Sequence, residues 1–144
     1  MASSRTMPIV HINGTVLFEM ETPQSTPRNG AFIATMEEAV RQGIDLSGAD
    51  LFMEWLRGAN LRGAKLRGAF LAGAYIQDTD FTGADLRDAD LRISEYKEAI
   101  LTNAKLRGSK RRGKDTDIEP PWPSTEDALR QRVTELEEQL KNKT

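Results

Sequence analysis

The sequence contains no cysteine and a single histidine, His11. Without cysteine the chain cannot form a disulfide, a thiolate zinc site or a cysteine nucleophile. His11 stands in a short segment that offers it no partner for acid–base or metal chemistry. We therefore expect no catalytic residue, no cofactor site and no metal site, and a role other than that of an enzyme.

The chain also lacks a charge excess of either sign, because 20 basic residues are balanced by 22 acidic ones. This balance predicts no strong general attraction to nucleic acid or to an anionic membrane. No apolar run is long enough to span a bilayer, and no apolar segment follows Arg5 as in a secretory leader. We expect a cytoplasmic protein without membrane contact. The basic run at 110–114 is followed at once by acidic residues, which disfavours nucleic-acid binding.

What the sequence does contain is a repeat of five residues that continues without a break from residue 44 to residue 108. Alanine stands two residues before the central position in nine of the thirteen units, and glycine stands two residues after it in seven. The central positions are Leu46, Leu51, Leu56, Leu61, Leu66, Leu71, Ile76, Phe81, Leu86, Leu91, Tyr96, Leu101 and Leu106.

A period of five fits neither an α-helix nor a flat strand. Five residues advance a helix by about 500°, so the central residues would scatter around its surface. In a strand an odd period would send them to alternate faces. If each unit instead turns a corner, every central residue points inward, and four units close a coil of twenty residues. The sequence thus predicts an all-β solenoid whose central residues form a core ladder.

The triplets at 49–51, 59–61, 84–86 and 89–91 read Ala-Asp-Leu or Ala-Asn-Leu. This pattern resembles the consensus of the pentapeptide-repeat family, and the resemblance covers 65 of 144 residues. It implies a right-handed quadrilateral β-helix, here of about three coils. Some members mimic duplex DNA and bind type II topoisomerases such as gyrase. The repeats of this chain hold nine basic and ten acidic residues, a balance that argues against such mimicry.

The segment before the repeats is predicted to close the first coil. Residues 1–7 are expected to be disordered. Asn13-Gly14 lies between two apolar runs in residues 8–20 and predicts a β-hairpin. The stretch Thr35–Glu38 has the pattern of a capping box, so a short helix is expected to begin there and to end at Gly43. Residues 8–43 would then form a hairpin and a capping helix.

Residues 109–123 are predicted to be a linker, and residues 124–144 an amphipathic helix. Four apolar residues of this helix are spaced 4, 3 and 4 apart, as in a coiled coil. This apolar seam consists of Leu129, Val133, Leu136 and Leu140. It favours a homo-oligomer, with a dimer preferred. The alternative is that the seam folds back on the end of its own solenoid.

Outward positions of the first two coils carry an aromatic patch made of Phe52, Met53, Trp55, Phe70 and Tyr75. An exposed group of this kind predicts a contact site. Its occupant could be the N-terminal hairpin, a second copy of the chain or a different protein. Glu54 occupies a position where a small inward residue is expected, which predicts contact with the N-terminal cap or a local bulge rather than a buried catalytic acid.

One face of the solenoid is expected to carry charges of both signs. These are Arg67, Arg87 and Arg107 beside Asp45, Lys65, Asp85 and Lys105, and they are expected to neutralise one another. Taken together, the sequence predicts a structural or protein–protein interaction module that oligomerises through its C-terminal helix, with topoisomerase binding as the alternative. It does not identify the protein partner.

Overall fold

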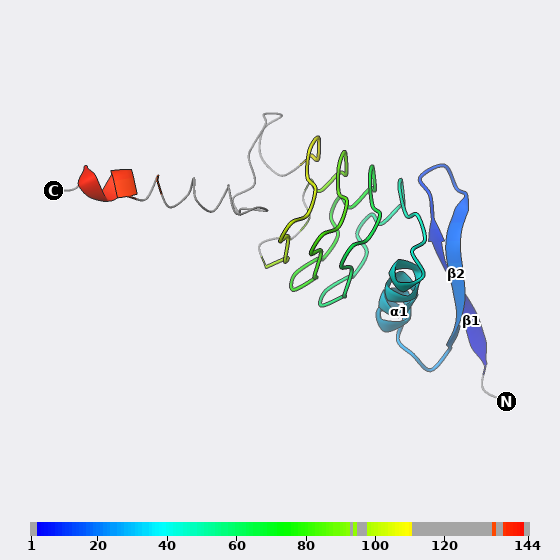
Figure 1. Ribbon diagram of the computed structural model, residues 1–144. Coiled ribbons are helices and arrows are strands. Elements are labelled where there is room, and N and C mark those ends of the chain that lie inside the picture. The colour runs from blue at the N-terminus through cyan, green and yellow to red at the C-terminus, as the bar shows by residue number, and fades with distance from the viewer. Residues whose placement is uncertain (1–2, 93, 95–97, 111–133, 135–136, 143–144) are drawn as a thin grey trace.

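The computed structural model describes residues 3–92, 94, 98–110, 134 and 137–142. Two strands, β1 (Ser4–Val10) and β2 (Val16–Pro23), form an antiparallel hairpin, and the helix α1 (Arg28–Arg41) follows it. The repeats then wind into coils that stack on one another. The hairpin and α1 stand together at the N-terminal end of this stack (Figure 1).

Backbone hydrogen bonds join each coil to the next, and the bonded residues are about one coil apart in the sequence. The Leu51 N–H donates to Phe70 O at 2.9 Å, and the Phe70 N–H donates to Ala49 O at 2.8 Å. Parallel bridges link residues exactly one coil apart, from Asp45 and Lys65 at the beginning to Asp90 and Lys110 at the end. The coil of twenty residues is thereby confirmed, and the ladder continues two residues beyond the predicted boundary at 108.

The core consists of the central residues and the small residues two positions before them. All central residues that the structure describes are buried, and Tyr96 lies outside the described residues. Alanines fill most of the small positions. At two of these positions a hydroxyl replaces the alanine and finds an acceptor inside the coil: Thr79 Oγ1 donates to Leu56 O at 2.7 Å, and Ser94 Oγ donates to Leu91 O at 2.6 Å. Both of these buried hydroxyls are therefore paired.

The aspartates of the consensus stabilise the corners of the coil. Asp50 Oδ1 accepts the Phe52 N–H at 3.2 Å, and Asp80 Oδ1 accepts the Thr82 N–H at 2.9 Å. In the units that have Asp or Asn at this position, the short polar side chain thus bonds the backbone two residues ahead, as Asp and Asn do in turns. The next residue along the chain has a positive φ, for example +70° at Gly63 and +69° at Gly83, and this conformation is the reason for the recurring glycine.

The hairpin is longer than predicted. Its turn at Asn13-Gly14 is confirmed, since the His11 N–H donates to Thr15 O at 2.7 Å. However, β1 begins at Ser4, within the segment that was expected to be disordered, and Ser4 pairs with Pro23. The hydroxyls of Ser4 and Thr6 donate to the Glu21 carboxylate at 2.7 and 2.5 Å, so side chains of β2 hold the start of β1 in place.

The predicted capping box at Thr35 is wrong. Helix α1 begins at Arg28, and Thr35 lies in its middle, where its Oγ1 donates to Ala31 O at 2.9 Å. The extra turns form because Ala31 and Phe32 continue the buried face of Met36, so packing extends the helix beyond its capping signal. The predicted end is confirmed: Gly43 has a φ of +72°, and the Ile44 N–H donates to Ala39 O at 3.0 Å.

The hairpin and α1 provide the hydrogen-bond partners that a preceding coil would otherwise supply. The Asp50 N–H donates to Val10 O at 2.7 Å, and Gly48 O accepts the Ile12 N–H at 2.9 Å. On another face, the Asn60 N–H donates to Glu37 Oε1 of α1 at 2.9 Å. The cap thus covers part of the strand edge at the beginning of the solenoid, which is an edge that would otherwise be free to pair.

The His11 ring packs so tightly on Gly48 that a Cβ at this residue would overlap it. Gly48→Ala should therefore destabilise the protein more than Gly63→Ala, because Gly63 has the same positive φ but nothing within 4 Å of its Cβ position. The conformational cost shared by both is roughly 1–2 kcal/mol. The free energy of unfolding, measured by chemical denaturation, checks this order.

The control is His11→Ala in both backgrounds. It should reduce the cost of Gly48→Ala to that of Gly63→Ala, with a coupling energy of about 1 kcal/mol. Equal costs for the two glycine substitutions with His11 present would contradict the packing of His11 against the first coil.

Candidate protein-interaction site

The aromatic patch is built from two stacked pairs of rings on adjacent coils. Trp55 and Tyr75 are partners in a parallel bridge, and their ring centroids lie 4.4 Å apart with an angle of 22° between the planes. Phe52 and Phe70 lie 5.3 Å apart at 7°. Because coils stack in register, the repeat brings together rings that are about twenty residues apart in sequence. Each stacked pair contributes about 0.5–1.5 kcal/mol beyond the area that it buries.

The patch is open to solvent on its outer side. Phe52 is 47% exposed, Met53 51% and Trp55 48%, while Phe70 and Tyr75 are partly buried beneath them. The hairpin, one of the three occupants considered from the sequence, does not cover these side chains. It reaches the first coil through the bridge between His11 and Ala49 instead.

Glu54 joins the patch to the N-terminal cap. Its carboxylate accepts two hydrogen bonds from the Arg28 guanidinium, both of 3.1 Å, so the side chain turns out of the core and toward the start of α1. The same guanidinium lies 5.8 Å from the Phe32 ring centroid. The hydrogen bond and the charge of Glu54 raise the pKa of Arg28. Of the two alternatives expected for Glu54, contact with the cap is the one that these hydrogen bonds show.

Sequence reasoning did not single out Arg28, nor did it single out Glu37, which accepts a hydrogen bond from the first coil. Both belong to α1 and act on residues more than twenty positions away in the sequence. Neither lies in a local pattern that indicates such a role. Their partners become apparent only when the helix is placed over the end of the solenoid.

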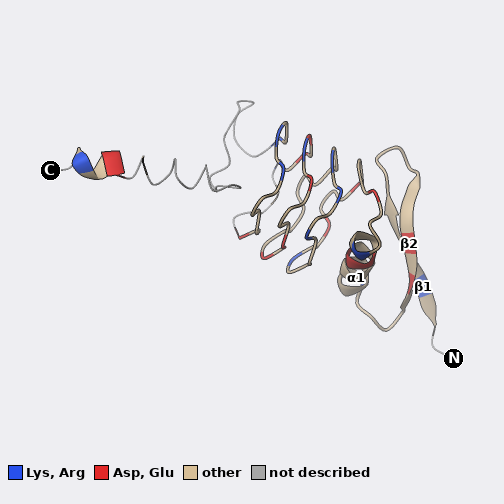
Figure 2. Ribbon diagram, in the orientation of Figure 1, with Lys and Arg blue, Asp and Glu red and all other residues tan. Residues whose placement is uncertain are grey.

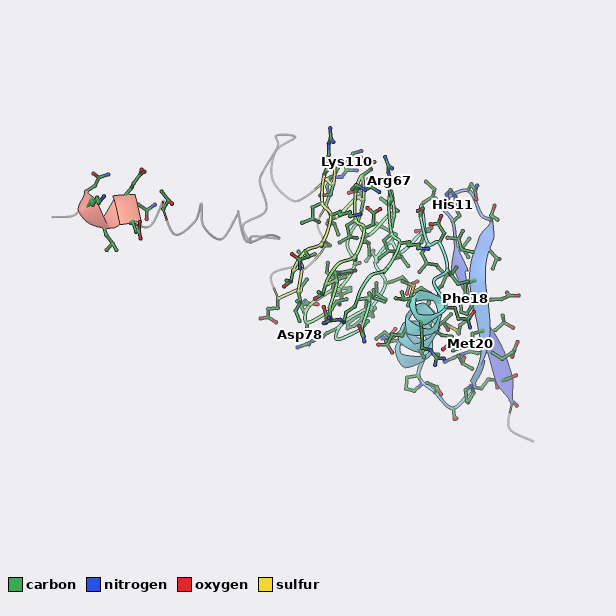
Figure 3. The ribbon with its side chains drawn as sticks, in the orientation of Figure 1. His11, Phe18, Met20, Arg67, Asp78 and Lys110 are labelled. Carbon is green, nitrogen blue, oxygen red and sulfur yellow. The ribbon has the colours of Figure 1, made fainter. Side chains whose placement is uncertain are left out.

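Charges of both signs are interspersed over the coils (Figure 2). Arg67 Nε lies 3.2 Å from Asp88 Oδ2, and Arg62 Nη1 lies 3.2 Å from Asp80 Oδ2. The hydrogen bond from Arg87 lowers the pKa of Asp85 to about 2. Arg67 and Lys110 lie near the same edge of the stack, and Asp78 lies near the opposite one (Figure 3). Acidic groups on these coils thus form ion pairs with arginines of the same or an adjacent coil.

His11 has a local structural role. Its Nδ1 accepts the Asn13 N–H at 3.0 Å, and its ring covers Gly48. Within the described ranges, no three histidine or carboxylate side chains gather in a way that could hold a metal ion. Among the helical segments that the structure describes, none is both long and apolar enough to cross a membrane.

Three of the four residues of the apolar seam lie outside the described residues, namely Leu129, Val133 and Leu136. The described C-terminal helical residues are 134 and 137–141, and Leu140 among them is 66% exposed. The structure therefore supports a short helix at this end but not a coiled coil. It also does not show Leu140 buried against its own solenoid.

Known proteins share the repeat. A family model described as pentapeptide repeats matches residues 56–92 with eight copies. A pentapeptide repeat protein from the thylakoid lumen of Arabidopsis thaliana is 32% identical, and the match covers 68% of this chain and 77% of that one, with a TM-score of 0.31.

A second solved structure is that of QnrB1, a plasmid-mediated fluoroquinolone resistance protein. It is 18% identical over 45% of this chain, with a TM-score of 0.39, and the match spans only 39% of the QnrB1 chain. No curated protein sequence matches the chain. The uninterrupted repeats, the match to their family model and the 32% identity to the thylakoid protein show that the chain belongs to the pentapeptide repeat family.

Proposed function

We propose that this protein is a non-enzymatic interaction module that binds a protein partner through the aromatic patch. The observation that carries the proposal is the exposure of Phe52, Met53 and Trp55 side by side at the capped end of the solenoid. Single exposed apolar residues are ordinary, but contiguous aromatic side chains are enriched at the centres of protein interfaces. Two of these side chains are already held in place by ring stacking, so binding would cost little side-chain entropy.

Met53 adds a second argument because its backbone is strained. It has a φ of +56° at the corner position that most units fill with glycine. Among the residues that the structure describes, the other non-glycine residues with a positive φ are asparagine or aspartate, which tolerate this conformation, namely Asp78, Asp88 and Asn103. A methionine that is both strained and half exposed costs stability. Such strain is found preferentially at binding sites.

The proposal includes self-association through the apolar seam. The described part of the C-terminal helix leaves Leu140 exposed in the single chain. An isolated helix as long as the predicted one, residues 124–144, is marginal in water unless its apolar side is covered. A second copy of the same helix would cover it symmetrically. The module would then present two aromatic patches per dimer.

The charges of the solenoid speak against the alternative of a duplex DNA mimic that binds a type II topoisomerase. Such a mimic needs an acidic surface, whereas Arg62, Arg67 and Arg87 pair with the aspartates of their own face or of the adjacent coil. The repeats as a whole hold nine basic and ten acidic residues. We therefore favour a partner that recognises aromatic side chains.

Replacing both Trp55 and Tyr75 with serine should reduce the capture of a specific partner by at least tenfold, because interface aromatics often contribute more than about 1.4 kcal/mol each. The measurement is an affinity pull-down with the full chain, in which the captured partner is identified and quantified. The matched control is Ile100→Ser, which removes another exposed apolar side chain outside the patch.

Light scattering on the same proteins separates binding from assembly. The Trp55 and Tyr75 substitutions should leave the mass of the wild type unchanged, whereas Leu136→Lys together with Leu140→Lys should reduce it to that of a monomer. A wild-type chain that is already monomeric would refute self-association. Undiminished capture by the serine variant would refute the role of the patch.

Met53→Gly should raise the free energy of unfolding by about 0.5–1 kcal/mol, because relief of the left-handed conformation exceeds the entropic cost of glycine. Asn103→Gly is the control and should change stability little, since asparagine adopts this conformation readily. Chemical denaturation measures both. A loss of stability in the methionine variant would mean that the side chain packs usefully and that no strain is held there.

A further inference from the structure

We propose that the aromatic patch binds a proline-rich extended segment and that its occupant is residues 119–123 of the same chain. This inference rests on the proposed role of the patch as a contact site. The segment reads Glu119-Pro120-Pro121-Trp122-Pro123 and lies outside the described residues. Residues 111–118 separate it from Lys110, and it has an aromatic residue of its own, Trp122.

The chemistry of the two surfaces matches. Proline-rich segments with prolines at PxxP spacing dock against exposed aromatic rings, because the rings pack on the flat faces of the prolines and little entropy is lost on binding. Pro120 and Pro123 have this spacing. The patch offers two pairs of stacked rings on neighbouring faces of the solenoid, and its outermost rings, Phe52 and Trp55, are about half exposed.

The point at which the described chain leaves the solenoid also favours this occupant. Lys110 stands in the same file as Phe70, since bridges connect Phe70 to Asp90 and Asp90 to Lys110. Two coil spacings separate Lys110 from Phe70, or about 10 Å. Lys110 lies at the end of the stack that is remote from the hairpin (Figure 3).

Residues 111–119 are nine residues that lie between Lys110 and the first proline. A chain of nine residues reaches about 30 Å when extended, and its root-mean-square length is roughly 15–18 Å if it is flexible. The span back to Phe70 is therefore well within reach. Linkers whose typical length is close to the required span give an effective concentration in the millimolar range, which favours binding within one chain.

Charge complementarity also favours this segment as the occupant of the patch. Acidic residues precede the prolines at Asp115, Asp117 and Glu119. Arg57 borders the patch, since it lies two residues after Trp55. Its side chain is 67% exposed, and its Nε lies 3.9 Å from Asp78 Oδ2. An acidic segment that approaches from the far end of the solenoid would meet this arginine beside Trp55.

The test uses the indole N–H resonances in the ¹H–¹⁵N spectrum of the full chain, which has only two tryptophans. Trp55→Phe and Trp122→Phe assign the two resonances. In the wild type the Trp122 resonance should differ from that of a free peptide spanning residues 115–125. Replacing Pro120, Pro121 and Pro123 with alanine should shift the Trp55 resonance and return the Trp122 resonance to the peptide value.

The reciprocal variant, Tyr75→Ser, should also release Trp122, whereas Ile100→Ser should leave both resonances unchanged. The proline variants lie outside the solenoid, so they remain informative even if Tyr75→Ser unfolds it. A Trp122 resonance equal to that of the free peptide in the wild type would overturn the inference. So would a shift that disappears on tenfold dilution, since the occupant would then be a second copy.

The test of segment docking and the test of partner binding can fail independently. If Trp122 stays free while partner capture still depends on Trp55 and Tyr75, the patch is a contact site for another protein only. If Trp122 docks and the proline variants capture more of the partner than the wild type, the segment occupies the same surface and competes for it. That second result supports both proposals.

Discussion

The backbone hydrogen bonds between successive coils are the constraint on which the rest of the structure depends. They hold residues twenty positions apart at the spacing of neighbouring strands, as in the bridges of Asp50 with Phe70 and of Trp55 with Tyr75. At that spacing only small side chains fit beside the central leucines, which accounts for the alanines. The corners require a positive φ, which accounts for the glycines. The composition of the repeat is thus a consequence of the stacking distance.

The first coil differs from the others because no coil precedes it to supply its backbone hydrogen-bond partners. The hairpin and α1 supply the missing partners through Val10 and Glu37. The aromatic side chains lie beside this junction, where Arg28 fixes Glu54 at the edge of the patch. A rigid stack with a closed end can present stacked rings to solvent without losing its core. This arrangement is the physical basis for proposing an interaction module.

Much of this architecture could be predicted from the sequence, because a strict period determines which side chains share a face. The register of Trp55 over Tyr75 and the inward position of the leucines follow from counting alone. The cap was less predictable. Thr35 stands in a good local capping pattern, but the packing of Phe32 and Met36 extends α1 past it. Arg28 and Glu37 gain their roles only from contacts with the solenoid, and no local pattern encodes those contacts.

The most direct test of the capped solenoid is native-state hydrogen exchange of individual amides, measured by NMR. The Phe70 and Asp80 amides donate to the coil before them, and the Asp50 and Asn60 amides are expected to be protected similarly, although the hairpin and α1 supply their acceptors. Protection of all four amides within about tenfold of one another would support this account. Exchange of Asp50 and Asn60 at the rate of an unprotected amide, with Phe70 and Asp80 still protected, would contradict it.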